Sequence, residues 1–466
     1  MKQSIRLLIT VSLLLGAMGF SNSITAQPCD PGQGGVGGTG TDVIIGDLIG
    51  TSNYGAAGGF HAYSVGTTSC NIGTEPLLWI SNTNEHPVIG QNLYRLHEGK
   101  FEQIGMSWLK HGFLALTGNV CGCGCINPGT GSLLGIGCSD PYSSGLNGQQ
   151  SGLGPRSEVF DVANGLYQYP VINSGLINDA TSKRLRVSTN DIDGGAFPGA
   201  VYIVEGQYVT VDDSAAGNSH NNCSYRTVTF GQTGNRNMTL TGTTQRQQPA
   251  IQAWQDFDPQ VTLTEIIDAD NGLTIVGYRV TELGAGQYAY EYAIFNMDST
   301  RSIGSFEFPL AGGVSLTEVD STHPLYHSGE PYSNLPWTAN QGAGTMSWST
   351  ETEAQNVNAN AVRWGTMHSF RFVANAPATL VTATLDHFTG GGSSTVDILA
   401  PSGDFTLPVT GLTCAQNGET VDLSWTNGET YDSIEVTRDG SVLSTLSGSI
   451  TSFNDASALP GLHTYG

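Results

Sequence analysis

The sequence is poor in charged residues, and above all in basic ones. Of 466 residues, 17 are Lys or Arg and 40 are Asp or Glu, which gives a formal net charge of −23. So negative an envelope repels phosphate backbones and anionic lipid surfaces. We therefore expect no nucleic-acid partner, and neutral glycans or cations are the more compatible ligands.

Long apolar runs are missing after the first 26 residues. Lys2 and Arg6 are followed by the apolar run LLITVSLLLGAMGF and then by a small residue at Ala26. This order of charge, apolar run and small residue predicts a signal peptide over residues 1–26. The run is too short and too interrupted by glycine to predict a membrane anchor. We expect a secreted, extracellular protein without membrane insertion.

Familiar catalytic fingerprints are also missing. The chain has no G-x-S-x-G, no Walker loop, no Rossmann glycine pattern and no H-E-x-x-H. These motifs supply a nucleophile, a phosphate cradle or a pair of zinc ligands in their respective enzyme classes. Those classes therefore have no support in the sequence.

Glycine, in contrast, is abundant, with 62 residues, and short segments that read as strands, such as FHAYSV and AVYIVEGQYVTV, separate the turns. PLLWIS, residues 76–81, is apolar enough to predict a central strand. Many short strands joined by Gly, Asn, Asp and Ser turns are typical of all-β folds. After a Gly-rich leader at 27–42, the sequence predicts two consecutive β-sandwich-like domains, at 43–248 and 249–405. The first is expected to be rich in loops and stapled by disulfides.

The last 60 residues or so carry three features of a known fold. Trp425 ends a VDLSW strand, Asp439-Gly440 turns a hairpin, and LPGLHTY places Tyr465 like a corner tyrosine. In these features 407–466 resembles a fibronectin type III domain. The resemblance implies a β-sandwich, a spacer or adhesive module, at 406–466. Its final strand is missing, so the natural chain is expected to continue.

A second resemblance covers residues 43–400. The phrases HPVIGQNLYRL, SWLKHGF, GLGPRSEV and NANAVRWGTMHSFRF are similar to those of uncharacterised secreted β-rich proteins of environmental bacteria. This resemblance implies an architecture and no particular chemistry.

Six of the eight cysteines fall before residue 140: Cys29, Cys70, Cys121, Cys123, Cys125 and Cys138. An exported protein meets an oxidising compartment, where cysteines pair. In an extended strand the CGCGC run would place its three sulfurs on one face, but metal-thiolate sites normally use wider spacings such as C-x-x-C. We therefore predict disulfides between this run and Cys70, Cys138 and Cys29.

A cluster of scarce basic side chains lies between residues 70 and 158. If the protein is an enzyme, its catalytic candidates are His86, Lys110, His111, Asp140, Tyr142, Arg156 and Glu158. Several of these types can abstract a proton or neutralise the carboxylate of an acidic sugar, and two carboxyls can form a general acid and base for glycoside cleavage. Alternatively, the basic residues form inert ion pairs on polar loops.

Aromatic and imidazole groups crowd a loop of the second predicted domain. In STHPLYHSGEPYSNLPW, residues 321–337, the binding candidates are Tyr326, His327, Tyr332 and Trp337. Such rings can stack on a sugar face or contact a protein when they are exposed. Alternatively, they cap the edge of the sandwich.

Two Asp-rich loops raise the question of calcium. TNDIDGG at 189–195 and DADNG at 268–272 resemble parts of calcium loops, but neither completes the pattern with a glutamate at the twelfth position. Asp-Asn-Gly is equally a good hairpin turn. Structural calcium stays an option without assigned ligands, and the sequence assigns no other cofactor.

The leading interpretation is a secreted modular β protein that binds an extracellular target, polysaccharide or cell-surface material in the first place. One alternative is an extracellular glycan lyase or hydrolase, or with less support a copper or zinc enzyme, whose site lies within 86–158. A second alternative is a structural surface or matrix component. A cleft lined by the catalytic candidates would favour the enzyme, and an exposed aromatic face near Trp337 would favour binding.

Overall fold

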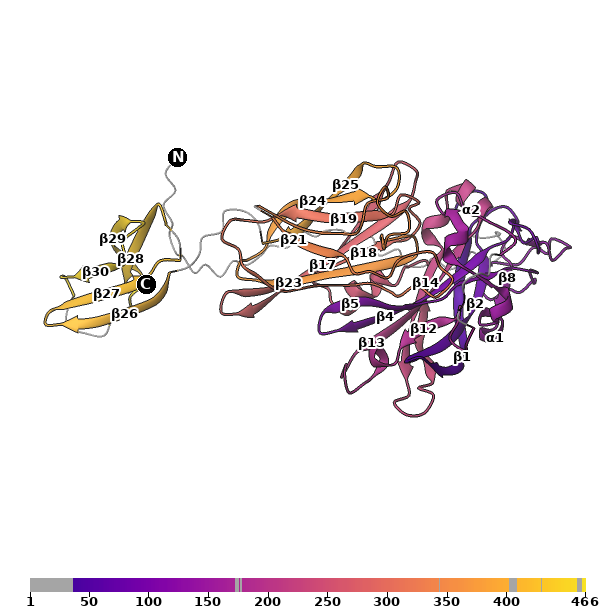
Figure 1. The fold of residues 1–466 in the computed structure, drawn as a ribbon, viewed down its shortest axis with the longest axis horizontal. Helices are drawn as coiled ribbons and strands as arrows, with labels where there is room; N and C mark the ends of the chain where they lie inside the picture. Colours follow the sequence, from indigo (N-terminus) through magenta and orange to yellow (C-terminus); the bar gives the residue numbers. More distant parts are fainter. Residues whose placement is uncertain are drawn as a thin grey trace. The chain divides into compact units, whose positions relative to one another are not determined.

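The computed structural model describes residues 37–171, 176, 178–342, 344–401, 409–428, 430–458 and 463–466. The predicted signal peptide, most of the Gly-rich leader and Cys29 lie outside these ranges. By its internal contacts the chain divides into two compact units, a larger one with residues 24–310 and 315–401 and a smaller one that is mainly 402–466. Both are built from antiparallel strands (Figure 1), which confirms the all-β prediction.

The first region of the larger unit is an 11-stranded sheet whose main path runs β1-β2-β12-β5-β4-β13-β14-β15. Its strands are β1 (Val43–Ala57), β2 (Phe60–Asn71), β4 (Val88–His97), β5 (Lys100–Met106), β6 (Leu109–His111), β8 (Ser139–Tyr142), β9 (Leu153–Gly154), β12 (Leu185–Ser188), β13 (Val201–Val209), β14 (Cys223–Phe230) and β15 (Met238–Gln245). Short pairs β3 (Leu77–Leu78) with β7 (Leu133–Leu134) and β10 (Val159–Asp161) with β11 (Leu166–Tyr167), and helices α1 (Ser144–Asn147) and α2 (Val211–Ala216), fill the connections.

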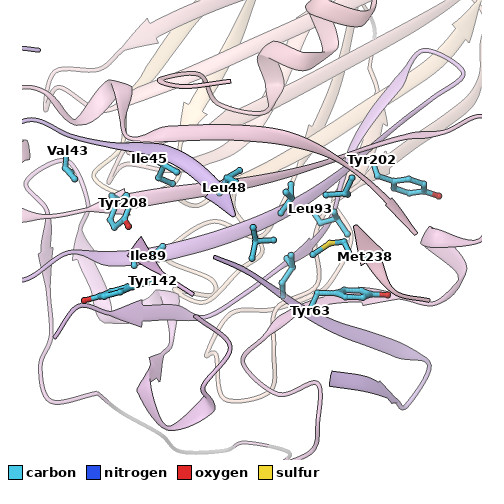
Figure 2. Close-up of a cluster of buried hydrophobic side chains, with 14 of the residues drawn as sticks. Val43, Ile45, Leu48, Tyr63, Ile89, Leu93, Tyr142, Tyr202, Tyr208 and Met238 are labelled. Carbon is cyan, nitrogen blue, oxygen red and sulfur yellow. The ribbon is translucent and has the colours of Figure 1, made fainter. Parts of the chain in front are cut away.

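This sheet folds over so that its first strand meets its last. The backbone N–H of Leu48 in β1 donates to Thr244 Oγ1 in β15 at 3.0 Å, and Thr51 Oγ1 donates to the carbonyl of Met238 at 2.8 Å. An apolar core fills the space inside, and Figure 2 shows part of it, including Leu93 and Tyr208. The result is the sandwich-like first region that the sequence predicts.

The second region consists of two five-stranded sheets that face each other. One contains β16 (Thr262–Ile267), β17 (Leu273–Gly284), β18 (Gln287–Asn296), β23 (Thr366–Ala374) and β20 (Leu316–Thr322), and the other β21 (Thr338–Gln341), β22 (Thr345–Ser349), β19 (Ile303–Pro309), β24 (Thr379–His387) and β25 (Ser393–Ala400). Aromatic rings from both sheets form the core: Phe306 stacks on Trp348 at 6.0 Å between ring centroids, and Trp348 lies 5.3 Å from Phe370. Such interlocking aromatics are typical of a β-sandwich.

The two regions share a buried seam. Strand β13 is buried on both of its faces, because Val204 enters the first core while Ile203 and Glu205 point to the other side, toward the second region. There the helix α3 (Ile251–Phe257) packs Trp254 on Phe101 at 6.1 Å. Strand β5 lies against β23 (Figure 1). The seam therefore joins both regions into one unit.

The smaller unit contains a three-stranded sheet of β26 (Thr410–Asn417), β27 (Thr420–Thr426) and β30 (Ser452–Asp455), and the hairpin of β28 (Ser433–Arg438) and β29 (Ser441–Ser447). Trp425 is buried with Leu423 and Val436 in its core. Asp439 and Gly440 turn the hairpin with φ of 51° and 79°. The resemblance to fibronectin type III domains stays a prediction.

Two disulfides tie the CGCGC run down, Cys70 to Cys121 and Cys125 to Cys138, and Cys123 is also disulfide-bonded. The predicted partners Cys70 and Cys138 are confirmed, and no thiolate metal site forms from this run. The run is not an extended strand, however. Gly122 and Gly124 adopt φ of 72° and 74°, which L side chains rarely do, so the cysteines face different partners.

Candidate functional site

Three catalytic candidates form a buried hydrogen-bonded chain in the first region. His86 Nε2 lies 2.9 Å from His111 Nδ1, and His111 Nε2 lies 2.7 Å from Glu158 Oε1. His111 ends β6, which pairs with β4 just after His86. Glu158 ends a 3-10 turn that follows β9, the other neighbour of β6. Strand pairing thus brings together side chains that lie up to 72 positions apart in the sequence.

The geometry of this chain fixes its protons. His86 Nδ1 faces the carbonyl of Ile80 at 3.1 Å, and a carbonyl only accepts, so Nδ1 carries a hydrogen. A neutral His86 then accepts at Nε2, His111 donates from Nδ1, and one further proton must lie between His111 and Glu158. Burial raises the pKa of Glu158 to about 9 and lowers that of His111 to about 4. The carboxyl therefore keeps that proton at neutral pH.

Lys110 and Tyr142 lie beside this chain. Lys110 Nζ donates to the carbonyl of His111 and lies 4.7 Å and 5.4 Å from the ring centroids of Phe113 and Tyr142. Burial lowers the pKa of Lys110 to about 8. The hydroxyl of Tyr142 accepts from Trp79 Nε1 at 2.9 Å. Lys110 thus contacts both His111 and Tyr142 and connects five of the seven catalytic candidates.

The cluster is nevertheless closed. His86 is 1% exposed, His111 7% and Glu158 4%. Among the described residues, nothing pairs with Glu158 Oε2, which is also buried. A general acid or base must come within hydrogen-bond reach of its substrate. In this structure the three side chains are buried in the interior of the first region and do not line an open cleft.

Asp140 and Arg156 do not join the cluster. Asp140 Oδ1 accepts from the backbone N–H of Leu116 at 3.0 Å, and burial raises the pKa of this carboxyl to about 7. Arg156 is fully engaged in the seam, where its guanidinium donates to Ser107 O, Gln91 O, Asn92 Oδ1 and Gly365 O at 2.7–3.0 Å. Arg156 is therefore a structural residue that links the two regions.

The aromatic loop of the second region does not display its rings. Tyr326 and His327 are each 3% exposed and Trp337 is 5% exposed. Trp337 packs 5.2 Å from Phe370, and His327 Nε2 contacts the carbonyl of Met106 in the first region at 3.1 Å. Tyr332 is half-buried, with the guanidinium of Arg363 at 3.9 Å from its ring. The expected binding face near Trp337 is corrected accordingly: these side chains cap the sandwich and join it to the first region.

A groove that the sequence did not reveal lies along the seam. We call it the seam groove; its volume is about 280 Å³. Its lining comes from both regions: Phe60, Arg95, Glu102, Gln103, Ile104, Arg186, Ser188, Asp191, Ser321, Thr322, His323 and Leu325. These residues are spread over more than 260 positions of the sequence, and they come together only in the folded chain. The one hint in the sequence is RLRVST, where arginines alternate with residues that become buried.

The charged side chains of the seam groove are held in place. Arg95 Nη2 lies 2.5 Å from Glu102 Oε2, and Arg95 Nη1 lies 3.0 Å from Asp191 Oδ1. Arg186 Nη2 donates to the carbonyl of Tyr326 at 3.1 Å, and its guanidinium lies 4.6 Å from the ring centroid of Phe60. The groove therefore offers fixed polar groups beside an aromatic ring.

The Asp-rich loops are closed by their own hydrogen bonds. Asp193 Oδ1 accepts from Gly195 N at 2.8 Å, and Asp268 Oδ1 accepts from Asp270 N at 2.8 Å. Across the described ranges, no group of three His, Cys, Asp or Glu side chains is placed to hold a metal ion. Calcium therefore has no assigned ligands in either loop.

No protein-family model and no curated protein matches the chain. Among solved structures, the chain is similar to the serine-rich repeat adhesion glycoprotein Srr1 from Streptococcus agalactiae, at 8% identity and a TM-score of 0.19, over 76% of this chain and 97% of that one. It is also similar to the BSP domain of a biofilm associated protein (11%, TM-score 0.13, 90% and 77%) and to the exo-beta-D-glucosaminidase CsxA (8%, TM-score 0.14, 72% and 25%). Likenesses this weak carry no argument about function.

Proposed function

We propose that this chain is an exported β protein that binds an extracellular glycan in the seam groove. The observation that carries the proposal is the groove itself, which combines fixed polar side chains with the ring of Phe60. Two disulfides support export. In the described part of the chain, no helix is long and apolar enough to cross a membrane.

Glycan recognition needs hydrogen-bonding groups that are already in position, because ordering flexible side chains on binding costs free energy. The ion pairs of Arg95 with Glu102 and Asp191 provide such order. An aromatic ring adds an apolar surface on which a sugar face can pack. The volume is near the lower end for small-ligand sites, about 300–1,000 Å³, and suits a short stretch of a glycan.

Binding fits this groove better than cleavage does. Glycoside hydrolysis needs one carboxyl that holds a proton and a second that is free to act as base or nucleophile. The carboxylates of the groove, Glu102 and Asp191, both accept from Arg95 instead. The other carboxyl that is paired for proton exchange, Glu158, is buried with His111 in the closed cluster.

An array of extracellular polysaccharides, followed by titration calorimetry on the best ligand, tests the proposal. Phe60→Ala should weaken binding by about tenfold or more, since it removes the ring from the groove. The matched control is Phe160→Ala, an exposed phenylalanine outside the groove, which should bind like the wild type. An array without any ligand, or equal affinities in both variants, would overturn the proposal.

A further inference from the structure

We infer that the seam groove recognises an anionic group on its glycan, a carboxylate or a sulfate, through Arg186. This inference rests on the proposed function, and it names the chemical class of the ligand. It follows from the ion pairs of the groove and from the placement of Arg186, and the charge of the whole chain limits which anionic glycan fits.

The two arginines of the groove differ in their partners. Arg95 is neutralised by Glu102 and Asp191. Within the described part of the chain, no acidic side chain lies within ion-pair distance of Arg186, whose hydrogen bond goes to the uncharged carbonyl of Tyr326. A guanidinium carries five N–H donors in a planar fork that matches carboxylate and sulfate oxygens. Arg186 therefore keeps donors and a positive charge for a ligand.

One carboxylate, that of Asp179, acts on Arg186 from a distance. Its Oδ1 atom is already engaged, since it accepts from the backbone N–H and the hydroxyl of Thr181 and from the N–H of Ser182. Asp179 does not line the groove. The carboxylate of Asp179 lowers the positive potential around Arg186, but it accepts no hydrogen bond from the guanidinium.

The backbone under Arg186 is rigid. In β12, Arg186 pairs with Ala62 of β2 on one side and with Met106 of β5 on the other. Its neighbours Leu185 and Val187 are buried in the core on the opposite face of the strand. Because side chains alternate along a strand, this register turns Arg186 away from the core and into the groove. The ring of Phe60 then holds the guanidinium.

The net charge of −23 limits which anionic glycan fits. Beyond about 8 Å, charges are largely screened at physiological ionic strength, so a single anionic group at Arg186 feels mainly its neighbours. A densely charged polyanion would also meet the acidic remainder of the surface. We therefore expect widely spaced anionic groups, such as one uronate per repeat, to bind better than a dense polyanion.

The test uses the full chain and three oligosaccharides of equal length: one neutral, one with a uronate and one with a sulfate. The wild type should bind an anionic ligand about tenfold or more tightly than the neutral one, and added salt should weaken only the anionic complex. The uronate and sulfate arms show which group supplies the anion. Arg186→Gln should weaken the two anionic complexes more than the neutral one and so reduce the preference.

The matched control is Arg184→Gln, two positions earlier in the chain, whose guanidinium donates to Gly148 O and Ala180 O outside the groove. This variant should retain the preference. Arg186→Lys keeps the charge but loses the fork, so an intermediate preference is expected even if the Gln variant is destabilised.

Equal binding of neutral and anionic ligands, or an equal loss for all three ligands in Arg186→Gln, would overturn the inference while leaving glycan binding intact. Phe60→Ala, in contrast, should weaken all three ligands. If none of the three ligands binds, the proposed function fails together with the inference.

Discussion

At the scale of single residues, the closed cluster of the first region is the most unusual feature of the chain. His86, His111 and Glu158 are joined by hydrogen bonds in the protein interior, and each of these bonds requires a hydrogen on one particular atom. Buried polar chains of this kind specify one packing of the core when they are fully satisfied, and they are costly when they are not. The contribution of this cluster to the stability of the fold therefore depends on the protonation states of its three side chains.

Glu158 gives the clearest pH prediction. Its pKa in the folded state, about 9, lies above the usual 4.5 because burial favours the neutral form. Its contribution to stability is thus fully present below about pH 4.5 and is lost as the pH rises toward 9. The wild type should lose up to about 1.4 kcal/mol of stability per pH unit in this window relative to Glu158→Gln, whose amide does not titrate. Urea unfolding at several pH values measures the difference.

The control for this prediction is Glu75→Gln, the same change at an exposed position, which should follow the wild type at each pH. The histidines act in the opposite sense. The pKa values of His86 and His111, both about 4, lie below their usual 6.5, so their contribution is present above pH 6.5 and is lost on acidification. Parallel curves for wild type and Glu158→Gln would show that the buried carboxyl is ionised in the folded protein.

At the scale of elements, the 3-10 turn Arg156–Glu158 connects two interiors. Glu158 points to the closed cluster, while Arg156 crosses the seam. Glu330, from the loop of the second region, accepts from the backbone N–H groups of Arg156 and Ser157 and so caps the turn. This short turn of the first region thus contacts both the second region and the buried cluster of His86, His111 and Glu158.

Arg156→Met should reveal this link. It removes four hydrogen bonds of the seam. Gln91 O and Gly365 O keep a second donor, in Ser107 N and Asn92 Nδ2, and each buried acceptor that is left without a partner costs about 1–3 kcal/mol. We expect a loss of about 3 kcal/mol or more in the free energy of unfolding, measured with urea. Arg301→Met, which removes a solvent-screened pair with Asp270, should cost much less. Similar losses in both variants would mean that the seam does not depend on Arg156.

The elements also show how far the sequence reaches. Alternation predicts β12 well, because its buried and half-buried residues follow the period of a strand. In β13 every residue after Val201 is buried, since this strand faces the first core on one side and the seam on the other. PLLWIS, predicted as a central strand, forms a strand only over Leu77–Leu78, because its partner β7 is also two residues long, and of its apolar residues only Leu77 and Trp79 are buried. The seam groove was beyond prediction for a physical reason: Phe60, Arg186 and His323 meet only through pairings between distant strands.

At the scale of the whole molecule, the seam changes the meaning of the predicted boundary near Pro249. The first and second regions have separate sheets, yet Trp254 packs on Phe101, and Glu205 of β13 accepts from the backbone N–H of Ala250 at 2.6 Å. A shared buried core makes the unfolding of one region costly for the other. The smaller unit, in contrast, has its own core around Trp425.

This arrangement predicts two calorimetric transitions, one for the larger unit as a whole and one for the smaller unit. Trp254→Ala should lower the larger transition without splitting it, by a loss of about 3–5 kcal/mol, because the cavity opens in a core that both regions use. Trp425→Ala should lower only the other transition, and so serves as the matched control. If Trp254→Ala instead separates the larger transition into two, the regions are independent domains that meet at the seam. The groove would then form between parts that can move, and glycan binding would stabilise their closed arrangement.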